Sequence, residues 1–113
     1  MSDRLNSNDS LAPNESLRSA NSRFTLVLQD DGNLVLYESD SQPVWATGTD
    51  GQAVSRATMQ PDGNLVLYSS GGDATWASET DGNDGAYLLL QDDRNLVIYS
   101  QAGSPVWASN TSE

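Results

Sequence analysis

The sequence contains no cysteine, no histidine and no lysine among its 113 residues. Without histidine or cysteine, the chain can form neither a Ser-His or Cys-His nucleophile pair nor a zinc site of the usual ligands. Without lysine it can form no Schiff base, and a P-loop would lack its lysine. Disulfides are impossible, so cysteine usage gives no information about the redox compartment.

Positive charge and long apolar runs are also scarce. Five arginines stand against 16 acidic side chains, which gives a net charge of -11. Because nucleic acids and anionic membranes attract Lys and Arg, this surface is predicted to repel both. The first ten residues are polar and predict no signal peptide, and the longest apolar run, residues 86–90, is too short for a membrane helix. The chain is therefore expected to be soluble, and it is cytoplasmic, secreted without a signal peptide, or one domain of a longer protein.

An internal repeat organises the chain. Trp45, Trp76 and Trp107 lie 31 residues apart, and a glutamine precedes each of them by 16 residues. Nine positions of the 31-residue unit are identical in all three copies, with no gap. Constant register over three copies predicts a pseudo-threefold arrangement within a single domain, residues 1–113. The predicted parts of this domain are an N-terminal edge segment and three repeats: 1–21, 22–52, 53–83 and 84–113.

Each repeat reads as β-structure. The segments 25–29 and 33–39 are rich in Leu, Val and Tyr and are separated by Asp-Asp-Gly, which is a strong hairpin signal. Adding the strand around each Trp and a second turn after it gives about four strands per repeat and roughly twelve in all, an all-β chain. In the third copy Arg94 replaces the turn glycine, so that turn is either strained or of another type. The N-terminal leucines, six residues apart, predict short edge strands that complete one sheet: Leu5, Leu11 and Leu17.

The two faces of each hairpin carry different residues. Leu34 and Leu36 alternate with Asn33, Val35 and Tyr37, so the leucines are predicted to face the core together with the three tryptophans near the axis. The other face repeats the pattern Gln-x-Asp-x-Asn-x-Val-x-Tyr. It contains donors, acceptors and one small apolar side chain, which suits a ligand with several hydroxyls and a C–H face, a sugar. The fifteen candidate binding residues are Gln29, Asp31, Asn33, Val35, Tyr37, Gln60, Asp62, Asn64, Val66, Tyr68, Gln91, Asp93, Asn95, Val97 and Tyr99.

These three motifs, with Trp at a constant offset, resemble those of the monocot mannose-binding (bulb-type, B-type) lectins over essentially the whole chain. The resemblance implies a β-prism II fold of three four-stranded antiparallel sheets. It also implies up to three shallow, metal-independent sites per chain for α-mannose and mannose-rich glycans, with no cofactor. Asp31 and Asn33 would then bind the axial 2-hydroxyl, Gln29 the 3-hydroxyl and Tyr37 the 4-hydroxyl, while Val35 packs against the ring carbons; the same roles pass to the other two motifs.

The resemblance further implies a homodimer formed by exchange of a C-terminal strand, for which residues 106–111 are the candidate. Three alternatives remain. An enzyme could use Asp30–Asp31 or Asp92–Asp93, although neighbouring turn residues rarely aim two carboxylates into one cleft. The acidic turns could bind calcium, but no D-x-[DN]-x-[DN]-G loop is present. The third is an antibacterial or protein-docking module in which sugar binding is secondary.

Overall fold

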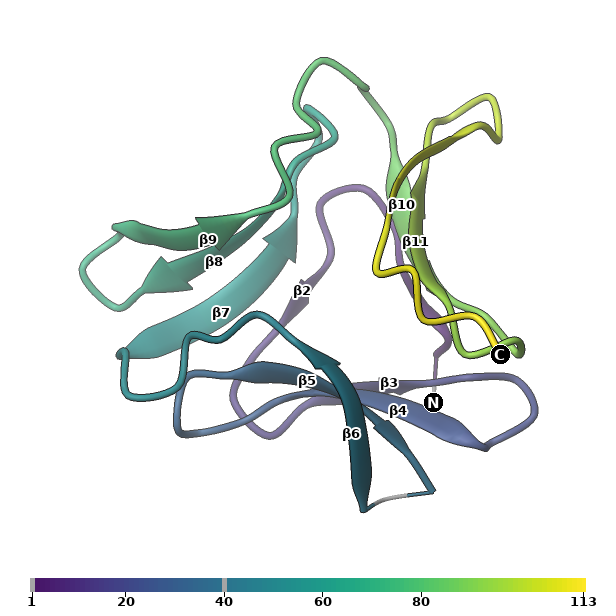
Figure 1. Cartoon of the computed structure of the whole chain (residues 1–113). Helices are drawn as coiled ribbons and strands as arrows, with labels where there is room; N and C mark the ends of the chain where they lie inside the picture. The colour runs from purple at the N-terminus through teal and green to yellow at the C-terminus, as the bar shows by residue number, and fades with distance from the viewer. Residues whose placement is uncertain (1, 40) are drawn as a thin grey trace.

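Three four-stranded antiparallel sheets form the molecule in a computed structural model that describes residues 2–39 and 41–113 (Figure 1). The first sheet contains β3 (Ser16–Arg18), β4 (Phe24–Leu28), β5 (Leu34–Glu38) and β6 (Gln42–Ala46). The second contains β2 (Ser10–Leu11), β7 (Val54–Met59), β8 (Leu65–Ser69) and β9 (Ala74–Ala77). The third contains β1 (Arg4–Leu5), β10 (Tyr87–Leu90), β11 (Leu96–Tyr99) and β12 (Pro105–Ala108). The described part of the chain has no helix of the length and apolar character that crossing a membrane requires.

The N-terminal segment corrects two predictions. Each repeat supplies three strands rather than four, and the fourth strand of every sheet comes from the N-terminal segment. Leu5, Leu11 and Leu17 therefore complete three different sheets, not one. The reason is length, because six extended residues span about 20 Å, enough to step from one face of the molecule to the next. The prediction of about twelve strands in an all-β chain is confirmed for the described residues.

Strand register sends the leucines inward, as predicted. On the first sheet Leu26 pairs with Leu36 and Leu36 with Trp45, while Val27 pairs with Val35 on the opposite face. Because side chains alternate along a strand, this register fixes which residues meet in the core. Leu34 and Leu36, like their counterparts on the other two sheets, are fully buried.

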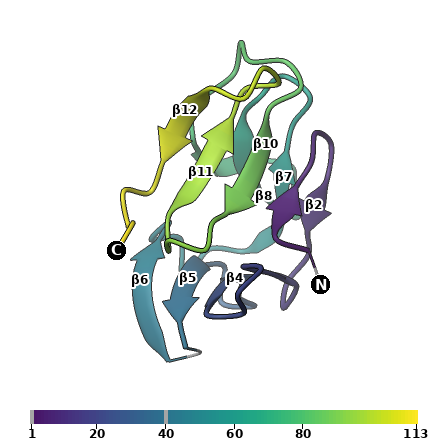
Figure 2. The same cartoon turned by 90° about the vertical axis from the view of Figure 1, so that its right-hand side faces the viewer.

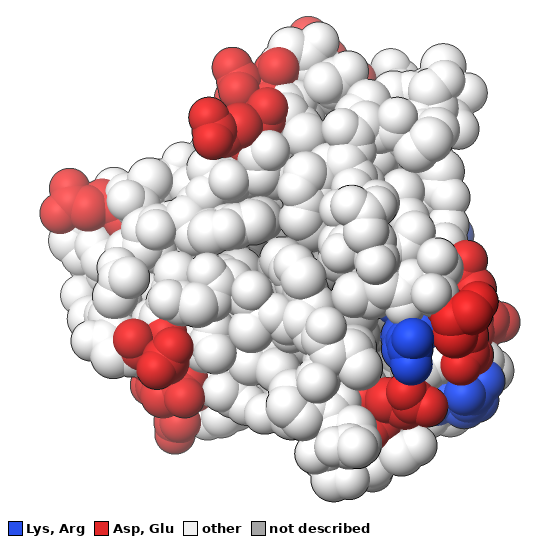
Figure 3. All heavy atoms as spheres, in the orientation of Figure 1, with Lys and Arg blue, Asp and Glu red and all other residues white. Residues whose placement is uncertain are grey.

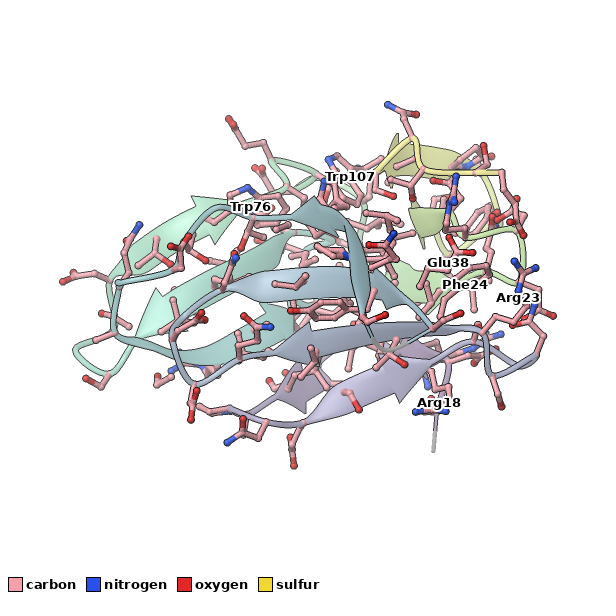
Figure 4. The ribbon with its side chains drawn as sticks, turned by 60° about the horizontal axis from the view of Figure 1, so that its bottom comes forward. Arg18, Arg23, Phe24, Glu38, Trp76 and Trp107 are labelled. Atoms are coloured by element: carbon pink, nitrogen blue, oxygen red, sulfur yellow. The ribbon has the colours of Figure 1, made fainter. Side chains whose placement is uncertain are left out.

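The tryptophans meet at one end of the pseudo-threefold axis, as predicted. Their ring centroids lie 5.6, 5.9 and 6.0 Å apart, and each pair is edge-to-face. They are only partly buried and pack against the leucine core (Figure 4 labels Trp76 and Trp107). Leu5, Leu11 and Leu17 lie at the other end, since their strands form the opposite edge of each sheet from the Trp strands; Figure 2 shows this order for the third sheet.

The junctions between neighbouring sheets are of two kinds. At the two inner junctions the backbone between successive repeats lies against the turn, and the carbonyl groups of Gln52 and Asn83 approach Gly32 and Gly63 closely. At the junction between the third repeat and the first, side chains join the turn to the first sheet. Arg94 forms an ion pair with Glu38 at 2.8 Å, and Arg23 forms one with Glu113 at 2.8 Å.

This closing junction gathers charge at one corner of the molecule. Figure 4 shows Arg23 and Glu38 at the same end of the first sheet, and Figure 3 shows basic and acidic side chains together near the C-terminus while the centre of that view is uncharged. The hydrogen bond and the charge of Glu113, followed by the charge of Glu38, raise the pKa of Arg23. These carboxylates therefore favour the protonated form of the guanidinium.

Candidate functional site

The fold places each motif on the outer face of a different sheet. In the first copy Gln29 directly follows β4, Asp31 lies in the turn, and Asn33 directly precedes β5, which carries Val35 and Tyr37. The second motif spans β7 and β8, and the third spans β10 and β11, in the same way. The fifteen predicted residues are thus brought together as three separate groups of five. The three groups face three different directions, so one chain offers three independent surfaces (Figure 1).

The turn aspartate and the following asparagine are held by the backbone. Asp31 Oδ1 accepts a hydrogen bond from the Asn33 amide at 2.9 Å, and the corresponding distances are 3.0 Å for Asp62 and 2.9 Å for Asp93. This side-chain bond two residues along the chain fixes the carboxylate relative to the turn. The carboxylate itself is exposed, so its second oxygen is available as an acceptor.

Glutamine and tyrosine form the other half of each group. The side-chain amide of Gln29 is hydrogen-bonded to the Tyr37 hydroxyl at 2.5 Å, and the same pair forms in the second and third copies. With the Gln29 oxygen accepting from Tyr37, its nitrogen lies 3.2 Å from both carboxylate oxygens of Asp31. Gln29 therefore bridges Asp31 and Tyr37, and the three side chains hold one another in place.

The motif asparagine has a structural role that the sequence did not suggest. Asn33 Oδ1 accepts from the Gly48 amide at 3.0 Å, the Thr49 amide at 3.2 Å and the Thr47 hydroxyl at 3.2 Å. That oxygen therefore anchors the loop after β6. The nitrogen Nδ2 has no hydrogen-bond partner among the described residues, and it is the atom left to donate to a ligand.

The motif valine is more enclosed than the sequence suggested. Val35, Val66 and Val97 are on the predicted outer face, yet they are only 4 %, 3 % and 3 % exposed. Each lies on a central strand between the motif asparagine and tyrosine. A ligand can therefore contact only a small apolar patch at the base of the group, not a whole valine side chain.

The second group lies in a hollow of about 470 Å³. Its lining includes Gln60, Asp62 and Tyr68 of the motif, together with Arg56 from β7 and Asn8 from the N-terminal segment. Arg56 was missed by the sequence reasoning, although a signal existed. In the hairpin register the residue opposite the motif tyrosine is Thr25 in the first copy and Arg56 in the second, so it could have been found by counting back from the turn.

The chemistry of each group is that of a neutral hydrogen-bonding surface beside one carboxylate. It offers an amide donor, a carboxylate acceptor and a hydroxyl that can do either, above a small apolar patch. Among residues 2–39 and 41–113, no three acidic side chains gather closely enough to hold a metal ion. Such an arrangement can bind a polyhydroxylated ligand. Because the group is shallow and exposed, it suits binding at the surface rather than enclosure of the whole ligand in a pocket.

Comparison with known sequences gives partial matches. No family model matches the chain. A mannose-specific lectin of Narcissus pseudonarcissus is 47 % identical over 47 residues, which are 42 % of this chain and 40 % of that protein. The match thus spans less than half the length of this curated relative.

Comparison with solved structures covers almost the whole chain. Monomeric monocot mannose-binding lectins from Gastrodia elata match with a TM-score of 0.89 and 47 % identity over 99 % of this chain and 100 % of theirs. The snowdrop (Galanthus nivalis) agglutinin complexed with methyl-α-D-mannoside matches with a TM-score of 0.80 and 41 % identity over 98 % of both chains. A domain-swapped lectin dimer from Mycobacterium smegmatis is 49 % identical over 92 % of this chain and 95 % of that one, with a TM-score of 0.57.

Proposed function

The chain belongs to the family of monocot mannose-binding lectins, and from this premise we propose that its three motifs bind α-mannose and mannose-rich glycans without a metal ion. Membership makes the chain a carbohydrate-binding lectin with the β-prism II fold predicted from the sequence. The sugar, the residues that bind it and the number of sites are the proposal.

The hydrogen bonds within each group support the assignment of roles. The exposed Asp31 carboxylate and the unpartnered Nδ2 of Asn33 offer an acceptor and a donor side by side, which suits the axial 2-hydroxyl of mannose. Gln29 and Tyr37 are held together for the 3- and 4-hydroxyls, and Val35 meets the ring carbons. Asp62, Asn64, Gln60, Tyr68 and Val66 have these roles in the second site. Asp93, Asn95, Gln91, Tyr99 and Val97 have them in the third.

Binding at a single site is expected to be weak. About four hydrogen bonds of ~1 kcal/mol each correspond to a dissociation constant of roughly 1 mM for a monosaccharide. Three sites on three faces would gain avidity on clustered mannosides, so surface glycans are better targets than free sugar. We assign binding and no catalysis, because each site has a single motif carboxylate on an open surface.

The observation that carries the proposal is the threefold recurrence of one Gln–Tyr–Asp–Asn arrangement. Titration calorimetry with methyl α-mannoside in EDTA tests it, with methyl α-glucoside and methyl α-galactoside as controls. We expect weak binding of the mannoside at more than one site per chain and none of the controls at equal concentration. Absence of heat with all three sugars at tens of millimolar would overturn it and favour the antibacterial or protein-docking alternative.

For assembly, we propose a homodimer formed by exchange of the C-terminal strand. Among the residues that the structure describes, β12 pairs with β11 of its own sheet and has no strand on its other side. A second copy could supply the same pairing, as in the domain-swapped relative, whereas the Gastrodia elata relatives are monomeric. Light scattering during size-exclusion chromatography is expected to give twice the chain mass. A monomer mass at all concentrations would overturn this.

A further inference from the structure

The three motifs are identical, but the residue beside the motif tyrosine differs from sheet to sheet. Tyr37 pairs with Thr25 across the first hairpin, Tyr68 with Arg56 across the second, and Tyr99 with Tyr87 across the third. Cross-strand partners on one face lie within side-chain reach of each other. A ligand at the tyrosine end of a site therefore meets a hydroxyl, a guanidinium or a second aromatic ring, according to the sheet.

Arg56 is exposed and has no acidic partner. Its guanidinium carbon lies 4.5 Å from the ring centroid of Tyr68, a cation–π contact. Among the described residues it makes no ion pair and no hydrogen bond, whereas Arg4 and Arg23 are each paired with a carboxylate. The five N–H donors of Arg56 are available to a ligand.

Arg56 also lines the hollow that contains residues of the second motif. The hollow of about 470 Å³ is lined by Arg56 together with Gln60, Asp62 and Tyr68. Asn8 encloses one side, and its position is fixed because its amide donates to the Met59 carbonyl at 2.6 Å. The hollow has room for a sugar ring with a substituent that reaches the guanidinium.

The charge beside the motif tyrosine differs between the second site and the other two. Arg56 brings a positive charge to the second site, which also contains the carboxylate of Asp62, so this site is locally neutral. The residues at the equivalent positions of the first and third sheets, Thr25 and Tyr87, are uncharged. An anionic ligand is therefore repelled less at the second site.

We propose that the second site binds mannosides that carry an anionic ester, a phosphate or a sulfate, on the side of the ring that faces Tyr68. This inference rests on the proposed function, which orients the 4-hydroxyl toward Tyr68 and so places substituents at carbons 4 and 6 near Arg56. A guanidinium binds such an oxyanion through two parallel N–H donors. Asp62 lines the same hollow, and its negative charge limits the gain that Arg56 provides.

The expected preference is moderate, because the arginine is exposed. An exposed ion pair with good geometry strengthens binding by about fivefold at low salt, and 0.5 M NaCl should remove most of this gain. At the first and third sites the same ester should weaken binding. The expected result is therefore a change in the order of affinity of the three sites. A uniform change in non-specific binding would not alter that order.

Amide-resolved NMR titration of the whole chain tests the inference, because it follows the three sites separately. The probes are methyl α-mannoside, methyl α-mannoside 6-phosphate and inorganic phosphate. We expect the neutral sugar to bind at several sites, and the 6-phosphate to bind about fivefold more tightly than the neutral sugar at the second site alone. Inorganic phosphate by itself should not shift the second site at the same concentration.

Two variants with equal charge changes separate the local effect from the general one. Arg56→Thr gives the second site the residue found at the first, and the ratio of 6-phosphate to neutral affinity there should fall to 1 or below. Arg4→Ser removes a guanidinium that lies over Tyr87 on the third sheet, and it should leave the ratio at the second site unchanged.

The results distinguish this inference from the function on which it rests. If methyl α-mannoside binds nowhere, the proposed function fails. If it binds but the 6-phosphate shows no preference for the second site, or a preference that Arg56→Thr leaves intact, only the present inference fails. A shift by inorganic phosphate equal to that by the 6-phosphate would also overturn it, since the sugar would then add nothing.

Discussion

The two inner junctions of the prism and its closing junction hold the same turn in different ways. Gly32 and Gly63 have φ values of 94° and 93°, and Arg94, at the equivalent position, has 79°. The backbone is thus left-handed in all three copies, and the surroundings differ. A Cβ on Gly63 would lie 2.8 Å from the carbonyl carbon of Asn83 and closer still to its oxygen.

This difference follows from the order of the chain. After the first and second repeats the backbone continues across the turn into the next sheet, so the turn residue must be glycine for steric reasons. At the third turn the Glu113 amide donates to the Asp93 carbonyl at 2.9 Å. A side chain fits there, and Arg94 uses the space to contact Thr111 and Glu38. Equivalent positions in a repeat therefore need equivalent conformations but not equivalent residues.

The largest effect is expected from Gly63→Ala. The added Cβ collides with the backbone of Asn83, and alanine is strained at positive φ. Together these are expected to lower the free energy of unfolding by about 3 kcal/mol or more. Urea unfolding monitored by tryptophan fluorescence measures this loss.

Gly82→Ala is the matched control for Gly63→Ala. Gly82 has a φ of 95°, and nothing lies within 4 Å of a Cβ built on it. Only the conformational strain remains, about 1 kcal/mol. Equal losses from the two substitutions would contradict the view that close backbone approach, rather than φ alone, requires glycine in the inner junctions.

The sequence predicted most of the fold because the repeat and the strand pattern are local signals. The spacing of Trp45, Trp76 and Trp107 indicated the threefold axis, and alternation placed Leu34 and Leu36 in the core. The N-terminal strands were assigned to a single sheet because their partners lie far away in sequence. Leu11, for example, pairs with Ala57, and nothing near Leu11 encodes that contact.

The next largest effect is expected from Asn64→Ala, which should lower the free energy of unfolding more than Asn95→Ala does. Asn64 Oδ1 accepts from the Glu79 amide at 2.9 Å, the Thr80 amide at 3.3 Å and the Ser78 hydroxyl at 3.2 Å. Losing this acceptor should lower the free energy of unfolding by about 2 kcal/mol. Asn95 Oδ1 has two such donors, from Ser109 and Thr111, beside the chain end, so about 1 kcal/mol is expected there.

Thermal unfolding of the two asparagine variants measures this difference, and a mannoside titration records the loss of the corresponding site in each. A variant that lost binding with no change in stability would show that the asparagine oxygen does not anchor the following loop.

The sequence predicted that five motif residues lie together on each sheet, but it did not predict which of their atoms are hydrogen-bonded within the protein. The repetition of Gln, Asp, Asn, Val and Tyr marked all fifteen positions. Asn33 Oδ1 accepts hydrogen bonds from a loop that lies fourteen to sixteen residues later, at Thr47 to Thr49, so a local motif cannot predict this use of the oxygen. The depth of Val35 likewise depends on its neighbours across the sheet, which a motif does not specify.

Tyr68→Phe and Tyr99→Phe compare the motifs with little effect on the fold. Each removes one hydroxyl that is hydrogen-bonded to the motif glutamine, Gln60 or Gln91. Loss of one ligand hydrogen bond together with that support is expected to weaken mannoside binding about tenfold at the altered site only. Site-resolved NMR titration measures this. A loss at all three sites would mean that the sites are coupled, which the separation of the three sheets argues against.

The smallest effect is expected from Arg94→Gly, which makes the closing junction resemble the inner ones. The substitution removes the hydrogen bond to the Thr111 carbonyl and the ion pair with Glu38, both at 2.8 Å, and it also relieves the positive φ of a non-glycine residue. Because these contributions oppose each other, the free energy of unfolding should fall by no more than about 1 kcal/mol. The loss should shrink further in 1 M NaCl, where the ion pair is screened. Urea unfolding at low and high salt measures both values. A loss as large as that of Gly63→Ala would mean that Arg94 is as necessary to the third turn as glycine is to the second.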